Sequence, residues 1–173
     1  MIEIKEKDLK WAKDYIAGRK TGEWDQDIMD FYMSIPFHMA NEASQSKISE
    51  SIFKNNIRTP NSLESIEMGK GDSGTAARTF GPGKFQMYPQ VTNAIKGQTE
   101  SLMDNYYNQI NTLYHEEQHS LAFSRGDLDG GNDAFEHFKI GKLQVLHSSY
   151  KSTTVTFKDY VRDVMLGYLQ SQQ

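Results

Sequence analysis

Two histidines and a glutamate within five residues could bind and use a metal ion. The segment His115-Glu116-Glu117-Gln118-His119 separates its histidines by four positions, and residues with that spacing lie on one face of a helix. Both imidazoles would then reach the same metal ion, and Glu116 would act as a general base on a water molecule held there. This pattern indicates a zinc-dependent hydrolase, and it does not identify the substrate.

A third metal ligand must come from another part of the chain, because catalytic zinc usually has three protein ligands. Glu136 is the preferred candidate, since it follows a glycine-rich turn and shares a helical face with Ile140 and Leu143. His137 is the alternative, about 100° further round the same helix. Glu136 also follows Asp133 by three residues, which is a helix-capping arrangement.

One long amphipathic helix must carry the two histidines. Apolar residues recur at helical spacing between about residues 99 and 124, which predicts a single helix. On a helical projection, His115 and His119 fall on the side opposite this apolar stripe. The helix is therefore expected to pack one face into the core and to present the other to a cleft. The stripe consists of Met103, Tyr106, Tyr107, Ile110, Leu113, Tyr114 and Leu121.

Further helices are predicted on both sides of the motif, again from apolar residues at helical spacing. Thr156 and Asp159 have the spacing of a capping box at the start of the last one. These helices cover residues 8–17, 23–35, 48–53, 63–68, 132–148 and 156–169.

The region before the motif helix predicts a loop and a β-hairpin. Glycines recur between Gly69 and Gly83, which is typical of a mobile flap. Residues 78–80 and 84–88 alternate in the manner of strands on either side of a Gly-Pro-Gly turn. Residues 84–88 would then form an edge strand that an extended peptide could join. A purely structural hairpin is an equally good interpretation.

Length and composition favour one domain over residues 1–173, with an N-terminal helical and glycine-rich region (1–90) and a region of the motif helix and C-terminal helices (99–171). The net charge of −4 argues against nucleic acid as a partner. The absence of cysteine excludes disulfides and thiolate zinc sites. No signal peptide and no membrane span are expected, so we predict a soluble protein, exported by a dedicated secretion system or as part of a longer polypeptide.

The motif, the Gly/Asp/Asn loop and the acid that follows resemble the zincin-type metallopeptidase domains at the C-termini of bacterial polymorphic toxins. The resemblance covers roughly residues 101–169 and is specific at His115, Glu116, His119 and Glu136. It implies a mostly α, α+β zincin-like domain that binds Zn²⁺. In that family's pattern the two histidines and Glu136 would be the zinc ligands, and Glu116 would be the general base.

The resemblance also implies a secreted effector that hydrolyses peptide or amide bonds in a protein target, with a cognate immunity protein as a further partner. His147 and Tyr150 are the downstream candidates for a transition-state donor, and no other cofactor is expected. Glu117 departs from the pattern, because the middle positions of such motifs are more often uncharged. The alternatives are a non-enzymatic interaction domain of an effector and a degenerate zincin that binds metal without turnover.

Overall fold

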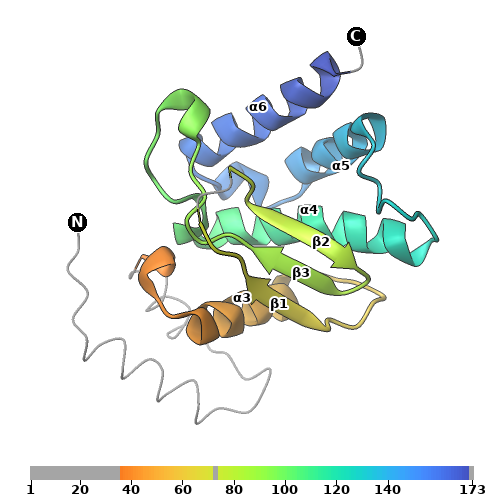
Figure 1. Cartoon of the computed structure of the whole chain (residues 1–173), viewed down its shortest axis with the longest axis horizontal. Coiled ribbons are helices and arrows are strands. Elements are labelled where there is room, and N and C mark those ends of the chain that lie inside the picture. Colours follow the sequence, from red (N-terminus) through yellow and green to blue (C-terminus); the bar gives the residue numbers. More distant parts are fainter. Residues whose placement is uncertain (1–35, 72–73, 172–173) are drawn as a thin grey trace.

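Helix α4 (Tyr106–Ser124) lies at the centre of the protein, with the sheet on one side and a pair of helices on the other (Figure 1). The computed structural model describes residues 36–71 and 74–171. Helix α4 packs against β2 of the sheet, against α3 (Glu42–Asn56) and against α5 (Ala134–Leu146). The described residues form a mostly α, α+β domain, as the sequence predicts. None of the helices within them is long and apolar enough to cross a membrane.

The sheet has three strands in the order β1-β3-β2. Strands β2 (Ala77–Gly81) and β3 (Lys84–Met87) pair in antiparallel fashion, which confirms the predicted hairpin. The prediction that residues 84–88 form an edge strand was wrong, because β1 (Ser65–Met68) pairs in parallel with the other side of β3. The edge strand that packs on α4 is β2.

Strand β1 replaces the short helix predicted for residues 63–68. Ile66 is buried in the core and aligns with Phe85 of β3. The apolar spacing of this segment was compatible with either element. A segment this short has only a weak local preference, and pairing with a neighbouring strand outweighs it.

Gly83 fixes the hairpin turn against α4. Its φ of +71° is in the left-handed region, and a Cβ atom would lie 2.2 Å from the Ser62 carbonyl oxygen. Its N–H donates to the Ser120 hydroxyl of α4 at 2.9 Å. Only glycine meets these conditions without strain, and the contact holds the hairpin beside the helix that carries the two histidines.

Helix α4 buries polar side chains as well as apolar ones. The Asn108 amide donates to the Leu102 carbonyl at 2.9 Å, and the Asn111 amide donates to the Gln144 carbonyl at 3.0 Å. Both asparagines are fully buried, and buried polar groups require such partners. These bonds position the turn before α4 and the end of α5.

The C-terminal helices follow the sequence prediction closely. Helix α5 is the predicted helix after the motif, and α6 (Val155–Gln170) packs along it. The cap of α6 is Thr154, which accepts from the Phe157 N–H, so the predicted capping box at Thr156 was wrong. The helices predicted for residues 8–17 and 23–35 lie outside the described residues.

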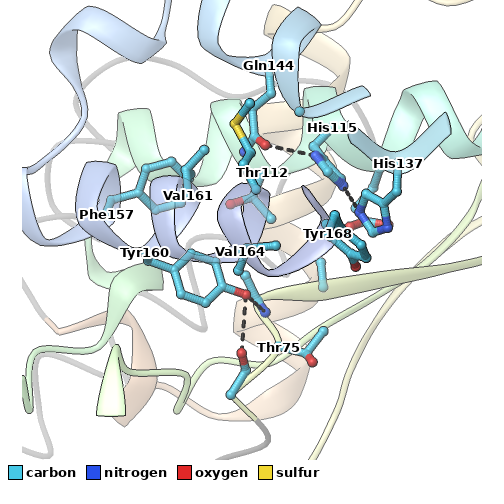
Figure 2. A pocket seen from close by; sticks show the side chains of 16 residues that line it. Thr75, Thr112, His115, His137, Gln144, Phe157, Tyr160, Val161, Val164 and Tyr168 are labelled. Atoms are coloured by element: carbon cyan, nitrogen blue, oxygen red, sulfur yellow. Dashed lines mark hydrogen bonds between the residues drawn. The ribbon is translucent and has the colours of Figure 1, made fainter. Parts of the chain in front are cut away.

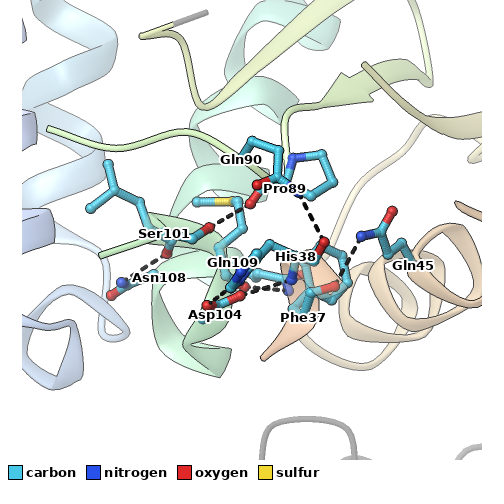
Figure 3. Close-up of polar contacts among 11 residues, drawn as sticks. Phe37, His38, Gln45, Pro89, Gln90, Ser101, Asp104, Asn108 and Gln109 are labelled. Carbon is cyan, nitrogen blue, oxygen red and sulfur yellow. Dashed lines mark hydrogen bonds and ion pairs between the residues drawn. The ribbon is translucent and has the colours of Figure 1, made fainter. Parts of the chain in front are cut away.

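A polar cluster joins the start of the described chain to the turn that precedes α4 (Figure 3). The His38 N–H donates to one Asp104 carboxylate oxygen at 2.9 Å, and the His38 ring pairs with the other at 2.7 Å. The Gln45 amide donates to the Phe37 carbonyl at 2.9 Å. These contacts hold residues 37–45 against the short 3-10 turn that ends at Asp104.

Candidate metal centre

Three histidine rings converge where α4 meets α5. His115 and His119 lie on successive turns of α4, and His137 lies in the first turn of α5. The Nε2 atom of His115 is 2.9 Å from Nε2 of His137 and 3.2 Å from Nε2 of His119. One nitrogen from each ring lies within 4.8 Å of the others, which is compatible with binding one metal ion.

The hydrogen bonds of the Nδ1 atoms determine which nitrogen is protonated in the His115 and His119 rings. The Nδ1 atom of His119 donates to the Gly130 carbonyl oxygen at 2.7 Å, and Nδ1 of His115 donates to the Gln144 amide oxygen at 2.8 Å. Both partners are acceptors, so each Nδ1 carries the proton of its neutral ring and each Nε2 presents a lone pair. The two Nε2 atoms therefore face each other without a proton between them.

This donor set fits a metal ion. Two lone pairs 3.2 Å apart repel each other, and a cation bound by both removes that repulsion. An outer hydrogen bond from Nδ1 to an oxygen also orients metal-binding histidines in general. The neutral nitrogen donors suit zinc and other transition metals better than magnesium or calcium, which prefer oxygen.

Burial keeps the histidines in the state that binds metal. Burial, together with the neighbouring His119 and His137 rings, holds the pKa of His115 well below its usual range. Burial and His119 lower the pKa of His137 to about 4. Both rings are therefore neutral near pH 7, as metal binding requires.

Glu116 lies beside the three rings and is almost fully buried. The Thr79 hydroxyl of β2 donates to its carboxylate at 2.6 Å and to its backbone carbonyl at 3.0 Å. Burial raises the pKa of Glu116, while His119 and the Thr79 hydrogen bond oppose that shift. A carboxylate whose pKa is raised toward neutrality is suited to accept a proton and release it again.

Glu136 does not join the histidines. Its carboxylate groups instead with those of Asp129 and Asp133. The Asp133 side chain caps α5 by accepting the N–H groups of Phe135 and Glu136, and this fixes the rotation of the helix. In that rotation His137 faces α4, so the geometry does not support the sequence-based preference for Glu136 over His137 as third ligand.

The two donor candidates from the sequence lie away from the rings. His147 follows His137 by ten residues, or about 15 Å along a helix axis, and its ring stacks on Tyr114 with the centroids 4.1 Å apart. Tyr150 lines a different hollow together with Lys158. Among the described residues, neither lines the hollows that contain Glu116.

Tyr168 is the tyrosine that the structure places at the site, and the sequence analysis missed it. Its ring lies on His137 with the centroids 4.1 Å apart, and it lines both hollows that contain Glu116 (Figure 2). Burial and the nearby Glu116 raise its pKa, so its hydroxyl stays protonated. Its spacing from Val161 and Val164 on the inner side of α6 was the available signal.

Glu117, the atypical residue of the motif, points away from the metal centre. It is buried, and one carboxylate oxygen accepts a hydrogen bond from the Thr59 hydroxyl. Burial raises its pKa. Glu117 therefore anchors the segment before β1, and its charge does not enter the site.

Histidines four residues apart on a buried helix, a third histidine from the next helix and an adjacent buried glutamate are characteristic of metal-dependent hydrolases. A family model described as metallopeptidase toxin 2 (Tox-MPTase2) matches residues 33–172, which include every residue of this site. The chain belongs to this family of metallopeptidase toxins. The comparisons with curated proteins and with solved structures gave no match.

Proposed function

We propose that the protein hydrolyses peptide bonds of a protein target with a zinc ion bound by His115, His119 and His137. The observation that carries this proposal is the pair of Nε2 lone pairs of His115 and His119, which face each other 3.2 Å apart. His137 adds a third neutral imidazole at 2.9 Å from His115. Three protein ligands leave a coordination position open for chemistry.

Glu116 is the general base of the proposed reaction. It takes a proton from the attacking water and passes it to the departing amine, while the Thr79 hydroxyl holds the carboxylate toward the site at 2.6 Å. Zinc, when bound, would polarise the scissile carbonyl and make the water more acidic. The Tyr168 hydroxyl would donate to the oxygen on which negative charge develops.

The biological role that follows is that of a delivered toxin. Membership in a family of metallopeptidase toxins supports a protein substrate. Delivery through a dedicated secretion system or as part of a longer polypeptide, and a cognate immunity protein that blocks the site, complete this proposal.

Elemental analysis and one pair of variants test the function. Protein purified without a histidine tag should contain about one zinc per chain. The Glu116→Gln variant should still bind zinc but should not hydrolyse a peptide mixture. Expression of the wild-type protein should slow bacterial growth, and expression of the variant should not. Glu117→Gln is the matched control, because it removes a buried carboxylate at the next position outside the site and should remain active. Metal-free protein, or hydrolysis that persists in Glu116→Gln, would overturn the proposal.

A further inference from the structure

A cavity of about 180 Å³ adjoins the metal centre between α4, α5 and α6. His115, Glu116 and His137 line it, and Figure 2 shows Tyr168 beside His137 at the same end as His115. A side chain that enters this cavity would therefore belong to a residue next to the bond being cleaved.

The cavity wall combines polar and apolar side chains, and close packing of α5 on α6 places much of its apolar part. Gly141 lets the helices approach, since a Cβ atom there would lie 3.0 Å from Cγ of Met165. A cavity of about 150 Å³ with apolar walls can bind a molecule of the size of benzene. The volume here is thus sufficient for one aromatic ring. The apolar side chains of the wall are those of Ala76, Ala77, Phe157, Val161, Val164 and Met165, with Gly141 between them.

We propose that this cavity is the specificity subsite of the peptidase and that it takes an apolar side chain next to the scissile bond, with an aromatic ring as the best fit. The proposal rests on the proposed peptidase function for its biological meaning. One aromatic ring matches the volume and the apolar part of the wall. Acidic side chains do not fit, because burial of their charge is costly and the Glu116 carboxylate lines the same cavity.

Cleavage of a peptide library tests the subsite. Zinc-loaded protein is incubated with the library, and the cleaved bonds are identified by mass spectrometry. One position beside the cleaved bond should be enriched in Phe, Tyr, Leu and Met and depleted in Asp and Glu. Cleavage without side-chain preference would overturn the proposal.

A matched pair of variants on α6 tests the place of the subsite. Val164→Phe fills the cavity and should shift the preference to Gly, Ala and Ser. Leu166→Phe adds the same ring two residues further on, in a different hollow, and should keep the preference of the wild-type protein. Equal preferences in the two variants would overturn the assignment of this cavity.

A binding measurement separates failure of the subsite from failure of the proposed function. If the library is not cleaved, the peptidase proposal fails. The cavity is then tested with N-acetyl-tyrosinamide by ligand-observed NMR. The probe should bind the wild-type protein and Leu166→Phe, and it should bind Val164→Phe at least about tenfold more weakly. Absence of binding, or equal binding to all three proteins, would overturn the subsite.

Discussion

The Nε2 atoms of His115 and His119 lie 3.2 Å apart, while the Nδ1 atom of each ring donates to an oxygen on the other side. The two oxygens belong to different segments: the Gly130 carbonyl lies in the turn after α4, and the Gln144 amide lies on α5. The turn and α5 therefore orient the two α4 histidines as well as bringing His137 to them. Affinity for metal should consequently depend on residues that do not touch it.

Gln144→Met should lower the affinity for zinc by roughly 10–100-fold, which is typical for loss of an outer hydrogen-bond partner of a histidine ligand. Methionine has a similar volume but cannot accept the His115 Nδ1–H bond. Competition with a chromophoric chelator measures the affinity. Gln144→Glu should retain it, because a carboxylate accepts the same bond. Unchanged affinity in Gln144→Met would contradict the assigned orientation of His115.

His137→Ala should lower zinc affinity more strongly than Gln144→Met, by at least about 100-fold, because it removes a ligand and not an outer partner. Glu136→Ala, at the adjacent position, should bind zinc like the wild-type protein, since the Glu136 carboxylate groups with Asp129 and Asp133. The same chelator competition compares the two. The reverse order of affinities would restore Glu136 as third ligand.

The sequence predicted the helix of the site and placed His115 and His119 on one face of it, because spacing along one helix is a local property. It preferred Glu136 to His137, because the rotation of α5 is set by the Asp133 cap and by packing on α4, which the sequence does not reveal. Tyr168 was missed for a related reason: its place at the site depends on the packing of α6 on α5. Two predictions that failed in the fold, the helix at residues 63–68 and the edge strand at residues 84–88, also concern segments whose structure depends on pairing between distant strands.

Tyr168→Phe should lower kcat by about 10²–10³-fold, the usual effect of removing one donor to a developing oxyanion. Its effect on KM and on zinc content should be small, because the ring that lies on His137 is kept. Peptide hydrolysis under saturating substrate gives kcat. Tyr150→Phe removes a hydroxyl outside the site and should leave kcat unchanged. A loss of zinc in Tyr168→Phe would instead indicate a structural role.

The metal-free protein should lose stability as the pH falls from about 6.5 to 4. In this range the unfolded chain protonates His115 and His137 at their ordinary pKa, near 6.5, whereas folding lowers the pKa of His137 to about 4 and that of His115 well below its usual range. The unfolded state therefore binds more protons, and the free energy of unfolding falls by at most about 1.4 kcal/mol per pH unit for each proton.

Urea unfolding in the presence of a chelator measures the free energy of unfolding, and the measurement is repeated from about pH 6.5 to 4. The His137→Gln variant isolates the contribution of His137. The pKa values of Glu116 and Glu117 are raised by burial, so these groups act in the opposite sense: the stability they contribute is lost as pH rises. Their contribution is present in both proteins and is largely removed by comparing them. The pH dependence should be weaker in His137→Gln, because one buried imidazole is gone and His115 loses a neighbour that lowers its pKa. Equal slopes would show that His137 titrates normally in the folded chain.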